Sequence, residues 1–83
     1  MNQVLKRTVY QRGTRKQALY MAELGGMNEE ETTAFLLLHD GHDDQYIMDE
    51  LGISKNSFRL IEESLRAKLL VAVFECIVYK MDS

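Results

Sequence analysis

The sequence predicts a small all-α domain of about four helices, the last of which is long. Three observations support this. The chain has no proline, its glycines divide it into segments of helical length, and the apolar residues of each segment recur at spacings of three and four. With 83 residues, of which 46% are hydrophobic and 28% charged, the chain has the composition of one globular domain. We therefore expect residues 1–83 to form a single unit.

The first two helices are delimited by glycines and by a polar cap. Residues 14–24 place apolar side chains among good helix formers, and the glycine pair at 25–26 is typical of a helix C-terminus. Asn28 is expected to cap the second helix, with Glu31 three positions later as in a capping box. This helix carries apolar residues at 34, 35, 37 and 38, and it should end at Asp40 and Gly41.

Two further helices follow from the same signals. Asp43 or Asp44 can cap a third helix, which Gly52 ends, and Ser54 can cap a fourth that meets no glycine or proline before the C-terminus. Beyond residue 70 the β-branched residues are compatible with a strand or with a helix buried on several sides, and we favour the helix. The apolar stripe of the fourth helix is Phe58, Ile61, Leu65, Leu69 and Ala72.

Charge is segregated along the chain, although the net charge is only -3. All charged side chains before Glu23 are positive, and all those from residue 23 to residue 53 are negative. This distribution predicts one face that can approach phosphates and one that cannot. The alternative is that the basic residues before Glu23, in the basic arm of residues 1–13 and at positions 15 and 16, fold over the acidic middle of the chain.

Residues 44–63, DQYIMDELGISKNSFRLIEE, predict a helix-turn-helix motif. A short helix ends at Gly52, which provides the backbone freedom for a tight corner, and a second helix follows Ser54. In this motif the N-terminal end of the second helix reads base edges, and serine hydroxyls and the helix N-terminus bind phosphate. The candidate DNA-binding residues are Ser54, Lys55, Asn56, Ser57 and Arg59.

Residues 28–69 resemble the helix-turn-helix of sigma-factor region 4 and of similar small bacterial and phage regulators. The matching elements are the acidic opening NEEE, the apolar helix AFLLLHDG, the corner DELGIS and the ending LRAKLL. The resemblance implies that the helix after the corner enters the major groove of duplex DNA. Two large residues depart from the family pattern, Met48 where a small residue is usual and Phe58 where a smaller aliphatic is common, so we expect a slightly opened corner.

The sequence predicts no enzyme, no metal site and no cofactor. The His and Asp residues of 39–44 lie within one turn, where cap and turn roles explain them, whereas a metal site needs ligands from several elements. Cys76 lies in an apolar stretch without a basic neighbour, and no glycine-rich phosphate loop is present. One cysteine, no signal-peptide pattern and no membrane-spanning apolar run favour a cytoplasmic protein without membrane contact.

Two flanking regions extend the expected interface. Arg12, Arg15 and Lys16 are expected to contact the DNA backbone or a minor groove, or else to form a solvated face. Residues 70–83 form an apolar C-terminal segment with more apolar surface than one helix stripe buries, which predicts either a homodimer interface or packing on the first helix. The interface residues would be Leu70, Val73, Phe74 and Ile77.

These observations together predict sequence-specific binding of duplex DNA by a small transcription regulator. A homodimer would place two recognition helices about 34–36 Å apart, as successive major grooves require. The alternative is an adaptor that uses the same fold to bind RNA polymerase or another regulator, because fold alone does not determine function. The acidic second and third helices would suit a basic protein partner.

Overall fold

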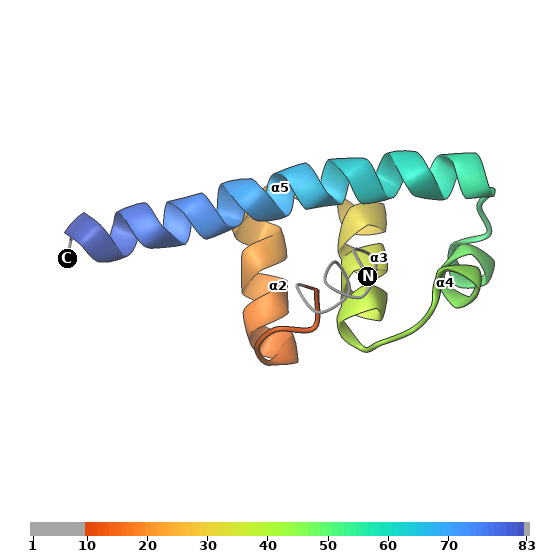
Figure 1. Cartoon of the computed structure of the whole chain (residues 1–83), viewed down its shortest axis with the longest axis horizontal. Helices are drawn as coiled ribbons and strands as arrows, with labels where there is room; N and C mark the ends of the chain where they lie inside the picture. The colour runs from red at the N-terminus through yellow and green to blue at the C-terminus, as the bar shows by residue number, and fades with distance from the viewer. Residues whose placement is uncertain (1–9, 83) are drawn as a thin grey trace, which may run out of the picture.

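The computed structural model describes the backbone of residues 10–82 and the side chains of residues 10–76. Helix α2 (Arg15–Leu24) is followed by α3 (Glu29–His39), α4 (Asp44–Leu51) and α5 (Lys55–Asp82), and the described residues contain no β-strand (Figure 1). The predicted all-α fold with a long last helix is therefore confirmed. The chain remains helical beyond residue 70, as we favoured.

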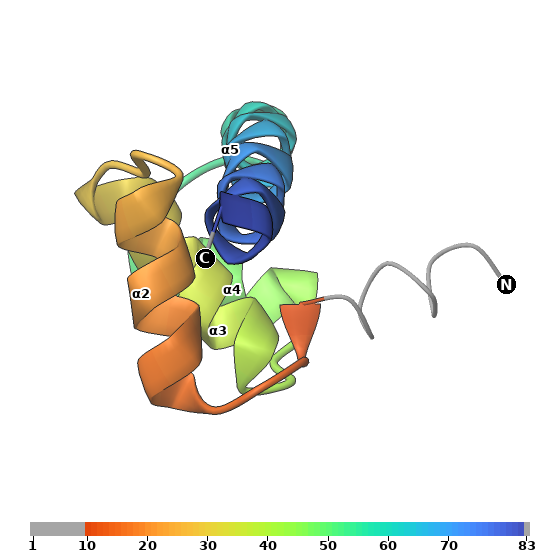
Figure 2. The same cartoon turned by 90° about the vertical axis from the view of Figure 1, so that its left-hand side faces the viewer.

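The long helix α5 sets the dimensions of the molecule. Its 28 residues correspond to about 42 Å of helix, and the longest dimension of the molecule is 43 Å. Helices α2 and α3 pack against each other and against α5, and α4 packs against α3 below the first turns of α5 (Figure 1). A view along α5 shows the other helices on one side of it (Figure 2). The opposite side of α5 is therefore not covered by them.

The core lies where α2, α3 and α5 meet. Ala18, Ala22 and Ala34 are buried. Their small side chains allow the helices to pack closely. The predicted stripe of α5 faces this core, with Ile61 partly buried and the others fully buried. The larger buried apolar residues are Tyr10, Phe35, Leu38, Ile47, Phe58, Leu65 and Leu69.

The helix caps follow the sequence signals closely. The Oδ1 atom of Asn28 accepts from the backbone N–H of Glu31 at 2.8 Å, and the Glu31 Oε1 atom accepts from the N–H of Asn28 at 3.0 Å, as in a capping box. Asp43, rather than Asp44, caps α4, since its carboxylate accepts from the N–H of Tyr46 at 2.9 Å. The capping box that Thr14 and Gln17 form at the start of α2 was not predicted.

Tyr10 belongs to the core, although it lies in the basic arm of residues 1–13. Its side chain is 2% exposed and its ring meets that of Phe35 edge-on, with centroids 6.3 Å apart. Its hydroxyl accepts a hydrogen bond from Nε of Arg66 at 3.2 Å, which raises the pKa of that guanidinium. The chain before α2 is therefore anchored to α3 and α5 at residue 10.

A buried carboxylate connects the start of α3 with the middle of α5. Glu31 is 4% exposed, and its Oε1 atom accepts from Nζ of Lys68 at 2.5 Å while Oε2 accepts from the hydroxyl of Ser64. Burial alone raises the pKa of Glu31, but the hydrogen bonds from Lys68, Ser64 and the Asn28 backbone outweigh it. The pKa of Glu31 is therefore lowered from its ordinary value of 4.5.

The end of α2 meets α5 at the same place. Gly25 follows α2 with ordinary helical torsion angles, yet a Cβ atom on it would overlap the backbone carbonyl of Lys68. Glycine is therefore required here by the close approach of two backbones. Gly26 is a different case, because its φ of 76° is the left-handed conformation and no atom lies within 4 Å of its Cβ position.

Among residues 10–82, none of the helices combines the length and the apolar content needed to cross a bilayer.

Replacing Glu31 by glutamine should make the stability of the protein less dependent on pH. A carboxyl with a lowered pKa in the folded state stabilises the fold above its ordinary pKa, and this contribution is lost as the pH falls through the folded value. At pH 7 the free energy of unfolding of Glu31→Gln should be lower than that of the wild type by about 1–2 kcal/mol. Urea denaturation between pH 7 and pH 3 measures this difference, which should shrink on acidification.

The exposed neighbour provides the control for this prediction. Glu30→Gln changes the same charge on the same helix turn without touching Ser64 or Lys68, and it should alter stability by at most about 0.5 kcal/mol. The pKa of Asp40 is also lowered, by its hydrogen bond with Arg15. This ion pair is present in the wild type and in both variants, so its contribution to the pH dependence of stability cancels. A difference between wild type and Glu31→Gln that stays constant from pH 7 to pH 3 would contradict the account.

Candidate nucleic-acid interface

The corner between α4 and α5 has the geometry that the sequence predicts. Gly52 has φ 64° and ψ 40°, the left-handed conformation that glycine adopts at little cost. The backbone N–H groups of Gly52 and Ile53 both donate to the carbonyl of Met48, that of Ile53 at 3.1 Å. Ile47 is fully buried and fixes α4 against α3, while Ile53 packs on the core from the corner. The direction in which α5 begins is therefore determined by buried contacts.

Ser54, immediately before α5, and the first two turns of α5 carry the residues that the sequence assigned to DNA contact within the motif. The Ser54 hydroxyl oxygen accepts from the N–H of Ser57 at 3.3 Å and lies 3.2 Å from the Ser57 hydroxyl, so the helix start is capped. The first backbone N–H groups of a helix have no intrahelical acceptor and can bind an anion. The exposed residues here are Ser54, Lys55, Asn56, Ser57 and Arg59.

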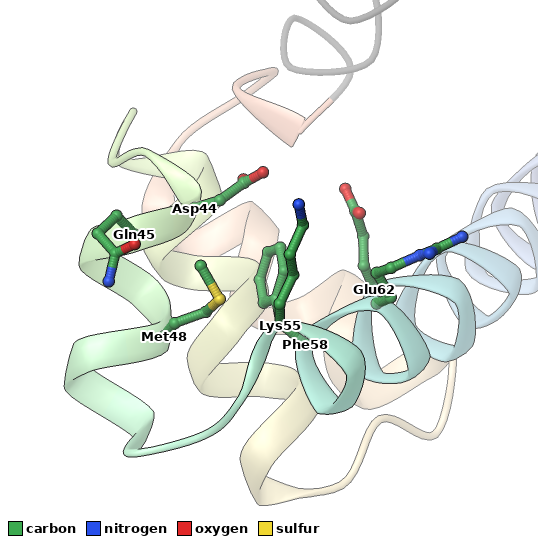
Figure 3. A pocket seen from close by; sticks show the side chains of 7 residues that line it. Asp44, Gln45, Met48, Lys55, Phe58 and Glu62 are labelled. Atoms are coloured by element: carbon green, nitrogen blue, oxygen red, sulfur yellow. The ribbon is translucent and has the colours of Figure 1, made fainter.

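A hollow of about 360 Å³ lies between α4 and α5 beside these turns (Figure 3). Met48 and Phe58, the two large residues for which we expected a slightly opened corner, both border it. Lys55 points toward the same opening as Asp44 and Glu62 (Figure 3). The carboxylates of Asp44 and Glu62 would repel a phosphate inside this opening. An anion would therefore bind better at the outer surface of α5 than in the hollow. The full lining is Asp44, Gln45, Met48, Lys55, Phe58, Arg59 and Glu62.

The three basic residues near the start of α2 are not equivalent. Arg15 is paired with Asp40 at 2.6 Å, and its hydrogen bond holds the pKa of that carboxyl below its ordinary range. For Arg15, the structure therefore agrees with the alternative that basic residues fold over the acidic middle of the chain. Arg12 and Lys16 are exposed, and neither forms an ion pair with another of the described residues. They are the cations of this region that are available to a ligand.

The His and Asp residues of 39–44 hold local structure together. The Nε2 atom of His39 lies 2.9 Å from the carbonyl oxygen of Gly13, and the ring of His42 stacks on that of Tyr46 with centroids 4.0 Å apart. Asp40 forms an ion pair with Arg15, and Asp43 caps α4. Within the described part of the chain, no group of three His, Cys, Asp or Glu side chains is arranged to hold a metal.

The described residues expected at a dimer interface are all exposed, and two of them also border α2. Leu70 and Phe74 are each 66% exposed. Leu70 and Val73, which is 41% exposed, border an apolar hollow of about 630 Å³ between α2 and α5, where the thiol of Cys76 lies 3.7 Å from the sulfur of Met21. The side chain of Ile77 lies outside the described residues. Packing on α2 therefore accounts for part of the apolar C-terminal segment, and an exposed part remains.

Comparison with models of known protein families, with curated proteins and with solved structures found no match to this chain.

Proposed function

We propose that this protein binds duplex DNA in a sequence-dependent manner through the first two turns of α5 and acts as a small transcription regulator. One observation carries the proposal: the left-handed corner at Gly52 is followed by two helical turns whose polar side chains are all exposed, on a helix fixed by buried contacts. An exposed helix that projects from a rigid support is what entry into a major groove requires. The resemblance of residues 28–69 to sigma-factor region 4 points to the same function.

The chemistry of these turns matches the groups that a major groove presents. Arg59 can donate two parallel hydrogen bonds to a guanine, and Asn56 can both donate to and accept from an adenine. Lys55 lies four residues before Arg59 on the same flank of α5, so both can reach the same strand. Ser54 and Ser57, together with the helix N-terminus, would bind a backbone phosphate.

The distribution of charge limits how far the helix can contact DNA. Glu62 and Glu63 occupy the turn after Arg59, and carboxylates there oppose contact with the phosphate backbone. The proposed contact therefore ends within the first two turns of α5. Arg12 and Lys16 would add phosphate contacts outside the groove, which contribute affinity without sequence preference.

A second function, binding of a basic protein partner, is favoured by a different observation. Leu60 is 68% exposed and lies one turn after Asn56 on the same side of α5. A large exposed apolar side chain gains more from a protein surface than from base edges. The acidic residues that begin α3 and α4 would complement a basic partner such as a surface of RNA polymerase or of another regulator.

Selection from a random duplex library, followed by titration of variants, separates these functions. The wild type should enrich a motif, and Asn56→Ala or Arg59→Ala should lose about 1–3 kcal/mol of preference for it over a scrambled duplex, because a bidentate base contact disappears. Fluorescence anisotropy at fixed salt measures both affinities. Glu30→Gln, an exposed change on α3, is the control and should bind as the wild type does.

Two outcomes would decide against DNA binding at this site. The first is a triple variant, Lys55→Ala with Asn56→Ala and Arg59→Ala, that selects and binds the same duplexes as the wild type while remaining folded. The second is a wild type that enriches no motif, while Leu60→Ala abolishes binding to a basic protein. The second result would establish the adaptor function in its place.

The salt dependence of DNA binding should report the contribution of Arg12 and Lys16. Each phosphate contact contributes about 0.9 to the slope of log K against log salt concentration. Arg12→Gln with Lys16→Gln should therefore flatten the slope and leave the sequence preference unchanged. Arg15→Gln should flatten it less, because Asp40 already neutralises that guanidinium.

Substitution is a better test here than truncation, because deletion of the residues before Thr14 would also remove Tyr10 from the core. Equal slopes for the wild type and the double variant would show that Arg12 and Lys16 form only a solvated face.

A further inference from the structure

The C-terminal half of α5 exposes a row of large apolar side chains, which begins with Leu70 at the rim of the hollow against α2 and continues onto the side of the helix opposite the buried stripe. Leu70 and Phe74 are each 66% exposed and Val71 is 51% exposed. They lie at spacings of one, three and four residues, so they share one side of the helix. On the side of α5 opposite the buried stripe, Figures 1 and 2 show no other helix. A contiguous apolar surface of this kind is typical of an interaction site.

Two charged residues on one flank of this surface are arranged symmetrically about its centre. Lys68 and Glu75 are seven residues apart, which is two turns, so they lie on the same flank of α5. The midpoint between them falls between Val71 and Ala72, at the centre of the apolar row. Lys68 donates to Glu31, but its side chain is 33% exposed and its ammonium carries three hydrogens, so it can bind a second carboxylate.

We propose that two copies of the chain associate through this surface with their α5 helices antiparallel. The twofold axis would pass between Val71 and Ala72. In an antiparallel pair the same flanks of the two helices face each other, so Lys68 of each copy would lie opposite Glu75 of the other. Leu70, Val71 and Phe74 would be buried between these two ion pairs, which is the self-complementary arrangement that a twofold interface requires.

A parallel pair would not bring Lys68 of one copy opposite Glu75 of the other. It brings opposite flanks together, and the flank opposite Lys68 and Glu75 carries Arg66 at nearly the height of Lys68. Like charges would then meet and the Lys68–Glu75 complementarity would be lost. A membrane surface is a poorer occupant as well, because helices that lie on membranes carry Lys and Arg beside their apolar face, whereas this flank carries one lysine and one glutamate.

The proposed dimer changes what is expected of the DNA site. Lys55 would lie about 25 Å from the axis, so the two first turns of α5 would be about 50 Å apart. That separation exceeds the spacing of about 34–36 Å predicted from the sequence for two successive major grooves. The dimer stands independently of the proposed function, and if both hold, an enriched DNA motif should contain one half-site rather than a one-turn palindrome.

Sedimentation measures the association directly. The full chain, with a mass of 9.6 kDa, should approach twice this mass as its concentration rises. Phe74→Ser should raise the dissociation constant at least about tenfold, because a central aromatic contact is removed, and Glu75→Lys should raise it by a smaller factor. Leu19→Ser changes an exposed apolar residue on α2 and is the matched control. A wild type that stays at 9.6 kDa at the highest concentration overturns the proposal.

Disulfide formation tests the orientation. In a Cys76→Ser background, Val71→Cys lies near the axis and should cross-link on mild oxidation. Phe74→Cys should not, because its two copies would be displaced by about 7.5 Å along the helices, beyond the reach of a disulfide. Cross-linking of Phe74→Cys but not of Val71→Cys would overturn the antiparallel arrangement. A dimer that selects no DNA would leave this proposal intact and contradict only the proposed function.

Discussion

The buried contact between the α2–α3 corner and the middle of α5 is the constraint on which the rest of the structure depends. Glu31 brings a carboxylate from the start of α3 to Ser64 and Lys68, and Gly25 brings the end of α2 against the backbone at Lys68. Both contacts meet α5 near its midpoint. They hold the helix there, while its first turns lead back to the corner at Gly52 and its C-terminal end extends beyond α2.

This arrangement divides α5 into two halves with different surfaces. The first turns expose short polar and basic side chains that suit a nucleic acid, whereas Leu70, Val71 and Phe74 expose apolar surface that suits a protein. The stripe buried on the core is continuous through both halves, so a single rigid helix connects the two surfaces. Rigidity matters for base recognition, because misplaced donors and acceptors lose the hydrogen bonds that discriminate between bases.

The helices could be predicted from the sequence because their signals are local. The cap at Asn28 and the glycine at 52 act within a few residues, and the apolar spacing of α5 identifies its buried side. The exposure of residues 54–57 and 59 follows from the same spacing. Contacts between distant residues could not be predicted in this way: Glu31 and Lys68 are 37 residues apart, and Tyr10 and Arg66 are 56 apart. For the same reason, neither the pairing of Arg15 with Asp40 nor the carboxylates beside Lys55 were foreseen.

The central claim is that duplex DNA binds at the first turns of α5, and mapping of backbone amide NMR shifts during titration with selected duplexes tests it most directly. The account predicts that the largest changes occur at residues 52–59, with smaller changes near Arg12 and Lys16. The signals of residues 70–76 should not move on addition of DNA. Changes confined to α4 or to residues 70–76, with residues 52–59 unaffected at saturation, would contradict it.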